Sequence, residues 1–190
     1  YIMIQNTDYT DYFMYTVGPL AVIYFGYQFS KIASSAERKK LTAAFILILL
    51  SIIFFALFEQ AGGSLALFAK NNLHDKLLFF HVDPNIVNNG ANALFVILFS
   101  PLLGLLWVWL DKRRLEPNTV VKFGISFVLL ALSYYIFFST KLFADGNGMT
   151  SLNVFTGAYF VMTISELCLS PIGLSMITSL SPKHLSGMML

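Results

Sequence analysis

The sequence predicts an all-α polytopic membrane protein. Of its 190 residues, 57% are hydrophobic and only 12% are charged, whereas ordinary soluble domains have about 25% charged residues. The charges are confined to short segments between long apolar stretches. A bilayer core of about 30 Å needs about 20 apolar residues per helix, and the uncharged intervals reach this length. This composition excludes a soluble nucleic-acid-binding protein and a disordered chain.

The uncharged intervals predict five membrane-spanning helices, at residues 12–30, 41–69, 86–110, 121–140 and 151–180. In chain order, the charged residues that bracket these intervals are Asp11 and Lys31, Lys40 and Glu59, Asp83 and Asp111, Lys122 and Lys141, and Asp145 and Lys183. The second run continues apolar beyond Glu59 to Ala69, and the fifth interval is interrupted only by Glu166. The second and fifth helices are long, so we expect them to tilt or to extend past the hydrocarbon core. Five apolar helices in succession leave no charged face for water, which excludes a soluble helical protein.

The loops predict the orientation of the helices, because short cytoplasmic loops are enriched in Lys and Arg. Most basic residues lie in segments 31–40 and 111–122, whereas the loops expected on the opposite side hold only Lys70, Lys76 and Lys141. We therefore expect segments 31–40 and 111–122 on the cytoplasmic side of a multi-pass protein.

The cysteine and histidine residues indicate neither a metal site nor an enzyme. Cys168 is the single cysteine and lies in an apolar run, so we expect it to be a small core residue. His74, His81 and His184 fall in loops and are not spaced as metal ligands on one face. Because neither a phosphate-binding glycine loop nor a nucleophile–base arrangement is present, we expect no enzymatic activity and no cofactor.

Glu166 is the strongest candidate functional residue. A carboxylate at the centre of a membrane helix costs about 2.5–3.5 kcal/mol on insertion scales, so it needs compensation. Polar and small residues recur around it at spacings of three and four, and they form one stripe on a helix: Tyr159, Thr163, Glu166, Ser170 and Gly173. This stripe must face protein or water. A structural ion pair and a substrate or proton site are both open for Glu166.

Glu59 and Asn92 are further candidates. Glu59 ends an apolar run, and its position allows either an outer-surface carboxylate or an inward-facing one. Asn85 and Asn88 stand where the third helix begins, so we expect them to cap it. Asn92 lies one turn further into the helix, where an inward-facing hydrogen-bonding role and a place at the helix start are both open.

Three segments resemble motifs of the proton-dependent oligopeptide transporter (POT/PTR) family. FFALFEQ at 54–60 resembles the seventh-helix motif of the family, and NALFVI at 92–97, which leads to Ser-Pro at 100–101, is similar to the eighth-helix motif. SELCLSPIGLS at 165–175 resembles the tenth-helix motif over a long and specific stretch. The motifs occur in the family's order, and the resemblance covers most of residues 41–190.

The family has the major facilitator fold, in which two six-helix bundles surround a central cavity. The resemblance implies that residues 1–40 form an extra helix and a cytoplasmic linker between the bundles. It implies that residues 41–190 form part of the C-terminal transmembrane bundle, namely helices seven to ten and the start of helix eleven. The N-terminal bundle would belong to the same polypeptide, and the protein would lie in a bacterial inner membrane.

The resemblance also implies a function, the proton-coupled symport of di- and tripeptides by alternating access. Protons are the coupling ion, and no cofactor is required. By motif, Glu166 meets the amino terminus of the peptide or a lysine of the other bundle and also takes part in proton coupling. Asn92 hydrogen-bonds the peptide backbone, and Glu59 is the proton-coupling carboxylate that pairs with an arginine of the first helix. The remaining expected substrate-binding residues are Phe55, Tyr159 and Ser170.

Two residues depart from the family pattern. Phe55 stands where many relatives have tryptophan, which predicts a differently shaped pocket wall, and Ala93 stands where many have proline, which predicts a weaker bend near Asn92. Relatives on this scaffold carry nitrate and other small compounds, so a carrier of another small solute remains an alternative. A membrane subunit or sensor that transports nothing is a second alternative.

Overall fold

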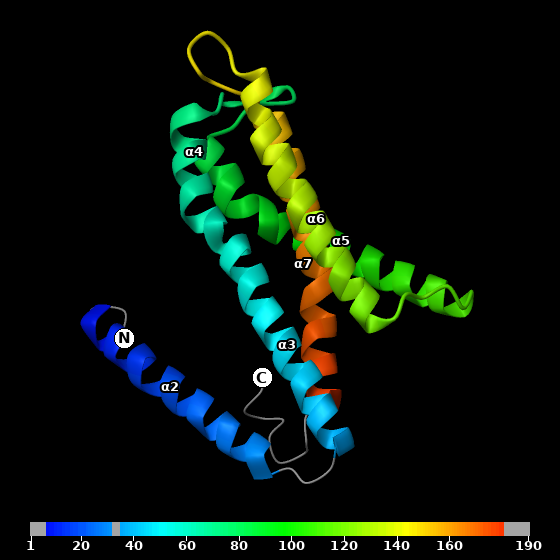
Figure 1. Ribbon diagram of the computed structural model, residues 1–190. Coiled ribbons are helices and arrows are strands. Elements are labelled where there is room, and N and C mark those ends of the chain that lie inside the picture. The colour runs from blue at the N-terminus through cyan, green and yellow to red at the C-terminus, as the bar shows by residue number, and fades with distance from the viewer. Residues whose placement is uncertain (1–6, 32–34, 181–190) are drawn as a thin grey trace.

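The structure is a computed structural model that describes residues 7–31 and 35–180 and is almost entirely helical (Figure 1). In chain order its elements are α2 (Thr7–Lys31), α3 (Ser35–Phe58), the 3-10 helix η1 (Glu59–Gly62), α4 (Ser64–Asn72), β1 (Lys76–Leu77), β2 (Phe80–His81), α5 (Pro84–Lys112), α6 (Thr119–Ser139), the 3-10 helix η2 (Thr140–Phe143) and α7 (Leu152–Leu180). The expected start of an eleventh helix, after Lys183, lies outside the described residues, and so do the side chains of α7 from residue 170 onward.

Four helical segments among the described residues are long and apolar enough to cross a membrane. They are Glu37–Asn72, Pro84–Lys112, Thr119–Phe143 and Leu152–Leu169, which confirms the all-α polytopic membrane fold. The helix expected at 12–30 is present as α2, although several of its side chains lie outside the described residues. Figure 1 shows α2 apart from the bundle formed by α3 to α7.

The helix starts follow from local capping. At the start of α5, Asp83 Oδ1 accepts a hydrogen bond from the backbone N–H of Asn85 at 2.7 Å. At the start of α6, Asn118 Oδ1 accepts one from the N–H of Val121 at 2.8 Å. Each side-chain oxygen satisfies an N–H that has no partner within its helix. Because Asp83 caps α5, the expectation that Asn85 and Asn88 cap it was wrong.

Helix α7 is the centre of the bundle, because α3, α5 and α6 all pack against it. Three rings form an aromatic cluster between α6 and α7: Phe137 of α6 lies 5.2 Å from Phe155 and 5.5 Å from Tyr159, centroid to centroid. On α3, Phe54 is buried edge-on against Phe127 at 5.5 Å. Such edge-to-face contacts are favourable, and this packing fixes the rotation of α7 relative to its neighbours.

The helix expected at 41–69 is not continuous. Helix α3 ends at Phe58, one 3-10 turn follows as η1, and α4 begins at Ser64. Gly62 and Gly63 lie at the break, where their low helix propensity weakens the continuation of the α-helix. The break places Glu59 at a turn between two helices instead of within a regular helix.

A small β-hairpin connects α4 to α5. Its strands pair Lys76 with His81 and Leu77 with Phe80. The backbone N–H of Leu78 donates a 2.8 Å hydrogen bond to Asn153 Oδ1 at the start of α7. The hydrogen bond joins the hairpin to the central helix. The sequence does not predict the hairpin, because strands of two residues are too short to show an alternating pattern.

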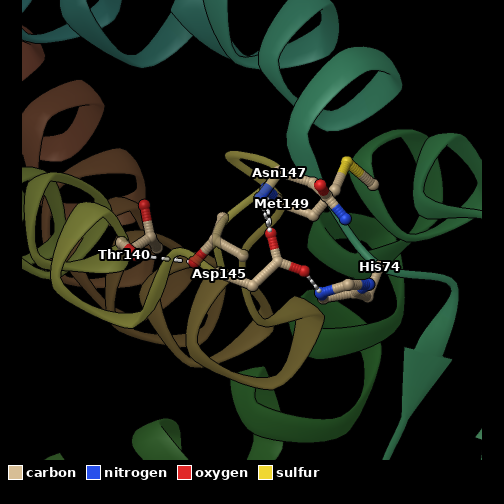
Figure 2. A network of polar contacts seen from close by, with 6 residues as sticks. His74, Thr140, Asp145, Asn147 and Met149 are labelled. Atoms are coloured by element: carbon tan, nitrogen blue, oxygen red, sulfur yellow. Dashed lines mark hydrogen bonds and ion pairs between the residues drawn. The ribbon is translucent and has the colours of Figure 1, made fainter.

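The segment between η2 and α7 is organised around Asp145 (Figure 2). Asp145 Oδ1 accepts hydrogen bonds from the backbone N–H groups of Asn147 at 2.9 Å and Met149 at 3.0 Å. Its Oδ2 lies 3.2 Å from His74 Nε2. The pKa of Asp145 is held below its ordinary value. The hydrogen bond from the Met149 N–H contributes most to this, followed by that from Asn147, and His74 adds to the effect.

Thr150 completes this connection. Its hydroxyl donates to the carbonyl of Thr140 at 2.6 Å, its N–H donates to the carbonyl of Asn72 at 2.7 Å, and its carbonyl accepts from the N–H of His74 at 3.0 Å. The end of α4 is therefore fixed to the α6–α7 connection by the His74–Asp145 contact shown in Figure 2 and by the two backbone hydrogen bonds of Thr150.

At the opposite end of α6, a buried lysine joins α5 to α6. Lys122 pairs with Glu116, and its ammonium lies 4.4 Å from the centroid of the Trp107 ring. The ring face and the carboxylate both compensate the buried charge.

Cys168 of α7 is 2% exposed, as expected for a small core residue.

We predict that Asp145→Asn lowers the Tm of the protein at neutral pH, because an amide oxygen accepts weaker hydrogen bonds than a carboxylate. Since the pKa of Asp145 is lowered in the folded state, its contribution to stability is complete above the ordinary aspartate pKa of about 4 and is lost as the pH falls through the lowered value. Thermal unfolding in detergent should show a Tm difference that is constant at neutral pH and shrinks in acid.

Asp75→Asn is the matched control, because Asp75 contacts His81 at the same 3.2 Å distance and its carboxylate accepts no backbone hydrogen bond from a described residue. We expect this variant to change the Tm less. A Tm difference for Asp145→Asn that does not vary with pH would contradict the assignment.

Candidate functional site

The polar stripe predicted on α7 meets α5 inside the bundle. The Thr163 hydroxyl lies 2.7 Å from Asn92 Oδ1 on α5 and 2.9 Å from the carbonyl of Tyr159 on its own helix. The Glu166 carboxyl group lies beside the Asn92 side chain. Spacings of three and four place Thr163 and Glu166 on one face of α7, so both side chains reach the same asparagine.

One turn along both helices, a second contact repeats this geometry. The Tyr159 hydroxyl donates to Asn88 Oδ1 at 2.6 Å, and Asn88 Nδ2 donates to the carbonyl of Ala61 in η1 at 3.1 Å. Tyr159 is only 1% exposed. Its buried place behind the polar face therefore differs from the direct substrate contact expected of it.

Glu166 is half-buried and keeps free hydrogen-bonding capacity. Its Oε2 atom is buried, with no hydrogen-bond partner in the described part of the chain. Among the described residues, neither Lys nor Arg forms an ion pair with Glu166. A structural ion pair within this part of the chain is therefore not formed, and a carboxylate held in this way can accept a donor from a cationic ligand.

Glu59 lies on the η1 turn, and its side chain is exposed. It forms no ion pair with a described residue. On the α3 side of the turn, the Tyr134 hydroxyl donates to the carbonyl of Leu57 at 2.5 Å. The turn that carries Glu59 is thus held from α6 at one side and from α5 at the other.

The other predicted site residues are less closely joined to this cluster. Phe55 is 36% exposed, and its ring packs edge-on against Phe54 at 5.4 Å and Phe58 at 6.3 Å. It lies on α3, four residues before Glu59 at the start of η1. The side chain of Ser170 lies outside the described residues, and the structure adds nothing on its role.

Sequence reasoning missed two residues of this region. Asn88 was assigned to capping, although it lies four residues before Asn92 and therefore on the same face of α5. That spacing was the signal for its inward position. Nothing in the sequence around Tyr134 indicates its contact, because its partner is a backbone carbonyl made available by the end of α3.

Within the described residues, no group of His, Cys, Asp and Glu is arranged to hold a metal ion.

Apolar spanning helices that enclose an acid–asparagine cluster define a class, the polytopic membrane proteins with a polar site among their helices. A family model described as the POT family matches residues 4–190 of this chain. The chain belongs to this family of transporters, which confirms the resemblance found in the three motifs.

Individual relatives agree with this assignment. The chain is 29% identical to dipeptide and tripeptide permease B of Xenorhabdus bovienii, over 99% of this chain and 38% of the relative. It is 35% identical to the di-/tripeptide transporter of Lactococcus lactis subsp. cremoris, over 89% of this chain and 34% of the relative. The crystal structure of a peptide transporter POT in complex with sulfate matches with a TM-score of 0.79 at 28% identity, over 99% of this chain and 39% of that one. The chain therefore spans less than half the length of these relatives.

We predict that Thr163→Val destabilises the protein by about 0.6 kcal/mol, and by about 1.7 kcal/mol at most, the range measured for hydrogen bonds between membrane helices. The substitution keeps the shape of the side chain and removes the hydroxyl that reaches Asn92. Thermal or denaturant unfolding in detergent measures the effect.

Thr156→Val is the matched control on the same helix, because among the described residues the Thr156 hydroxyl hydrogen-bonds only the Leu152 carbonyl of α7 itself, at 2.8 Å. We expect it to have the smaller effect. Equal effects of the two substitutions would show that the hydrogen bond between α7 and α5 adds nothing to the stability of the protein.

Proposed function

We propose that this chain is part of a proton-coupled symporter that carries di- and tripeptides into the cell by alternating access. The observation that carries the proposal is the cluster of Asn92 and Glu166 inside apolar helices of a POT-family chain. Two relatives are named for the transport of dipeptides and tripeptides. Membrane interiors tolerate such polar groups where they face a partner or a hydrated passage.

We propose the same division of the chain that the motifs imply. Residues 1–40 would be an extra helix with a cytoplasmic linker, and residues 41–190 would belong to the C-terminal bundle, as helices seven to ten and the start of helix eleven. The N-terminal bundle of the same polypeptide would complete the central cavity. We place the protein in a bacterial inner membrane, with segments 31–40 and 111–122 toward the cytoplasm.

Peptides of different sequence share an amine, amides and a carboxylate, so a site that reads these groups accepts many of them. In the proposed site Glu166 binds the cationic amine, and its free Oε2 supports this role. Asn92 bonds a peptide amide, and Phe55 supplies exposed apolar surface. Ser170 remains a proposed contact, while Tyr159 supports the site from behind. The basic groups for the peptide carboxylate would come from the N-terminal bundle.

Proton coupling is proposed to act through Glu59, with Glu166 as a second titrating acid. A carboxylate in a membrane protein is held ionised by a nearby cation and becomes neutral on protonation. An arginine of the N-terminal bundle would pair with Glu59, whose exposed position on the η1 turn leaves it available. Protonation would release this pair and shift the equilibrium between the two orientations of the bundles.

We predict that Glu59→Gln in the full transporter abolishes peptide accumulation driven by a proton gradient, because glutamine cannot take up or release a proton. Counterflow exchange of peptide needs no net proton movement, so it should remain measurable. Uptake of labelled dipeptide into proteoliposomes, with and without a pH gradient, tests both. Accumulation that persists in Glu59→Gln would refute the role of Glu59.

We predict that Glu166→Gln weakens dipeptide binding more than Asn92→Ala does. Losing a charge-assisted hydrogen bond weakens binding about tenfold to a hundredfold, whereas losing a neutral one weakens it about twofold to tenfold. Binding of a dipeptide and of its N-acetylated form can be measured by calorimetry. Acetylation removes the cationic amine, so Glu166→Gln should matter little for the acetylated ligand. Unchanged dipeptide binding in Glu166→Gln would remove this residue from the site.

A further inference from the structure

We propose that Tyr159 and Asn88 are positioning residues that hold the η1 turn, and with it Glu59, in register with the substrate-binding face of α7. We call the chain of groups from the Tyr159 hydroxyl through the Asn88 amide to the Ala61 carbonyl the brace. This inference rests on the proposed role of Glu59 in proton coupling and deepens it.

The amide of Asn88 is engaged at both ends. Its Oδ1 accepts from the Tyr159 hydroxyl at 2.6 Å, and its Nδ2 donates to the Ala61 carbonyl at 3.1 Å. An amide that accepts on one side and donates on the other cannot flip without breaking both contacts. The brace therefore joins α7, α5 and η1 through one side chain whose orientation is fixed.

The brace reaches the turn that carries Glu59. Ala61 lies two residues after Glu59 in the same 3-10 helix, and the last carbonyls of such a helix have no partner within it. On the other side of the turn, Leu57 accepts from Tyr134. The position of the Glu59 backbone is thus set by side chains of α5 and α6.

Burial makes the brace difficult to replace. Tyr159 and Asn88 are both buried, so bulk water is not available to satisfy an amide or carbonyl that loses its partner. An unsatisfied group of this kind is unfavourable in a membrane protein. We therefore expect the turn to move when the brace is broken, instead of remaining in place with open hydrogen-bonding groups.

The brace also connects Glu59 to the proposed substrate site. Tyr159 and Thr163 are one turn apart on α7, and their partners Asn88 and Asn92 are one turn apart on α5. The two contacts are successive rungs between the same helices, and the second rung lies beside Glu166. A shift of α7 against α5 on peptide binding would change both rungs together and move the Ala61 carbonyl. Packed side chains and hydrogen bonds that join two sites in this way carry energetic coupling between them.

The test uses the full transporter in proteoliposomes, with Tyr159→Phe, Asn88→Leu and the double variant. Tyr135→Phe is the matched control, because Tyr135 is an exposed tyrosine of α6 whose hydroxyl forms no hydrogen bond in the described part of the chain. Three quantities are measured for each variant: gradient-driven accumulation of a dipeptide, its counterflow exchange, and the external pH at half-maximal uptake.

We expect gradient-driven accumulation to fall about threefold to tenfold in each single variant, as for the loss of one buried hydrogen bond, while counterflow changes less than about twofold and the half-maximal pH shifts. Because both substitutions break the same brace, the double variant should resemble the single ones. Tyr135→Phe should match the wild type in all three quantities.

Two results would overturn the proposal. One is an equal fall in accumulation and counterflow with an unchanged half-maximal pH, which would give Tyr159 and Asn88 a merely structural role. The other is wild-type behaviour of Tyr159→Phe, the milder variant. Glu59→Gln in the same assay separates the coupling role of Glu59 from the positioning role of the brace. If Glu59→Gln still accumulates peptide, the coupling role of Glu59 fails. If it does not, wild-type behaviour of Tyr159→Phe refutes the brace alone.

Discussion

Inside a bilayer, every backbone N–H and C=O must find a partner within the protein, and this constraint governs the break between α3 and α4. Ending α3 at Phe58 leaves carbonyls without helical partners. Two of the carbonyls around the turn are met by side chains of other helices, Leu57 by Tyr134 and Ala61 by Asn88. The break therefore depends on α5 and α6 being in place. The position of Glu59, which lies at the break, is set by this tertiary packing.

Helix α7 serves packing and polar chemistry with two overlapping sets of residues. Toward α6 it presents Phe155 and Tyr159 to Phe137, and toward α5 it presents Thr163 and Glu166. Lipid is as apolar as these rings, so close packing and interhelical hydrogen bonds stabilise the arrangement instead of the hydrophobic effect. Tyr159 belongs to both sets, since its ring is in the aromatic cluster and its hydroxyl reaches Asn88.

Much of this arrangement could be predicted from the sequence, because hydrocarbon thickness fixes the length of an uncharged helix and polar groups within it are expensive. The helix positions and the inward-facing polar stripe around Glu166 follow from these two facts, whereas the contact of this stripe with Asn92 is seen only in the structure. The end of α3 did not follow, because the apolar pattern continues beyond Glu59 to residue 69 and only the glycine pair indicates a break. The role of Asn88 was hidden because an asparagine near a helix start fits a cap equally well, and only the partner on another helix decides between them.

The burial of Cys168 has a practical consequence for measuring motion in this protein. It is the single cysteine in the chain and is 2% exposed, so water-soluble maleimide or nitroxide reagents have little access to its thiol. Cysteines introduced at exposed positions near η1 and in the hairpin could therefore carry spectroscopic labels with the native thiol left in place. Distances between such labels, followed by electron paramagnetic resonance, would report rearrangements of these helices without disturbing the core around α7.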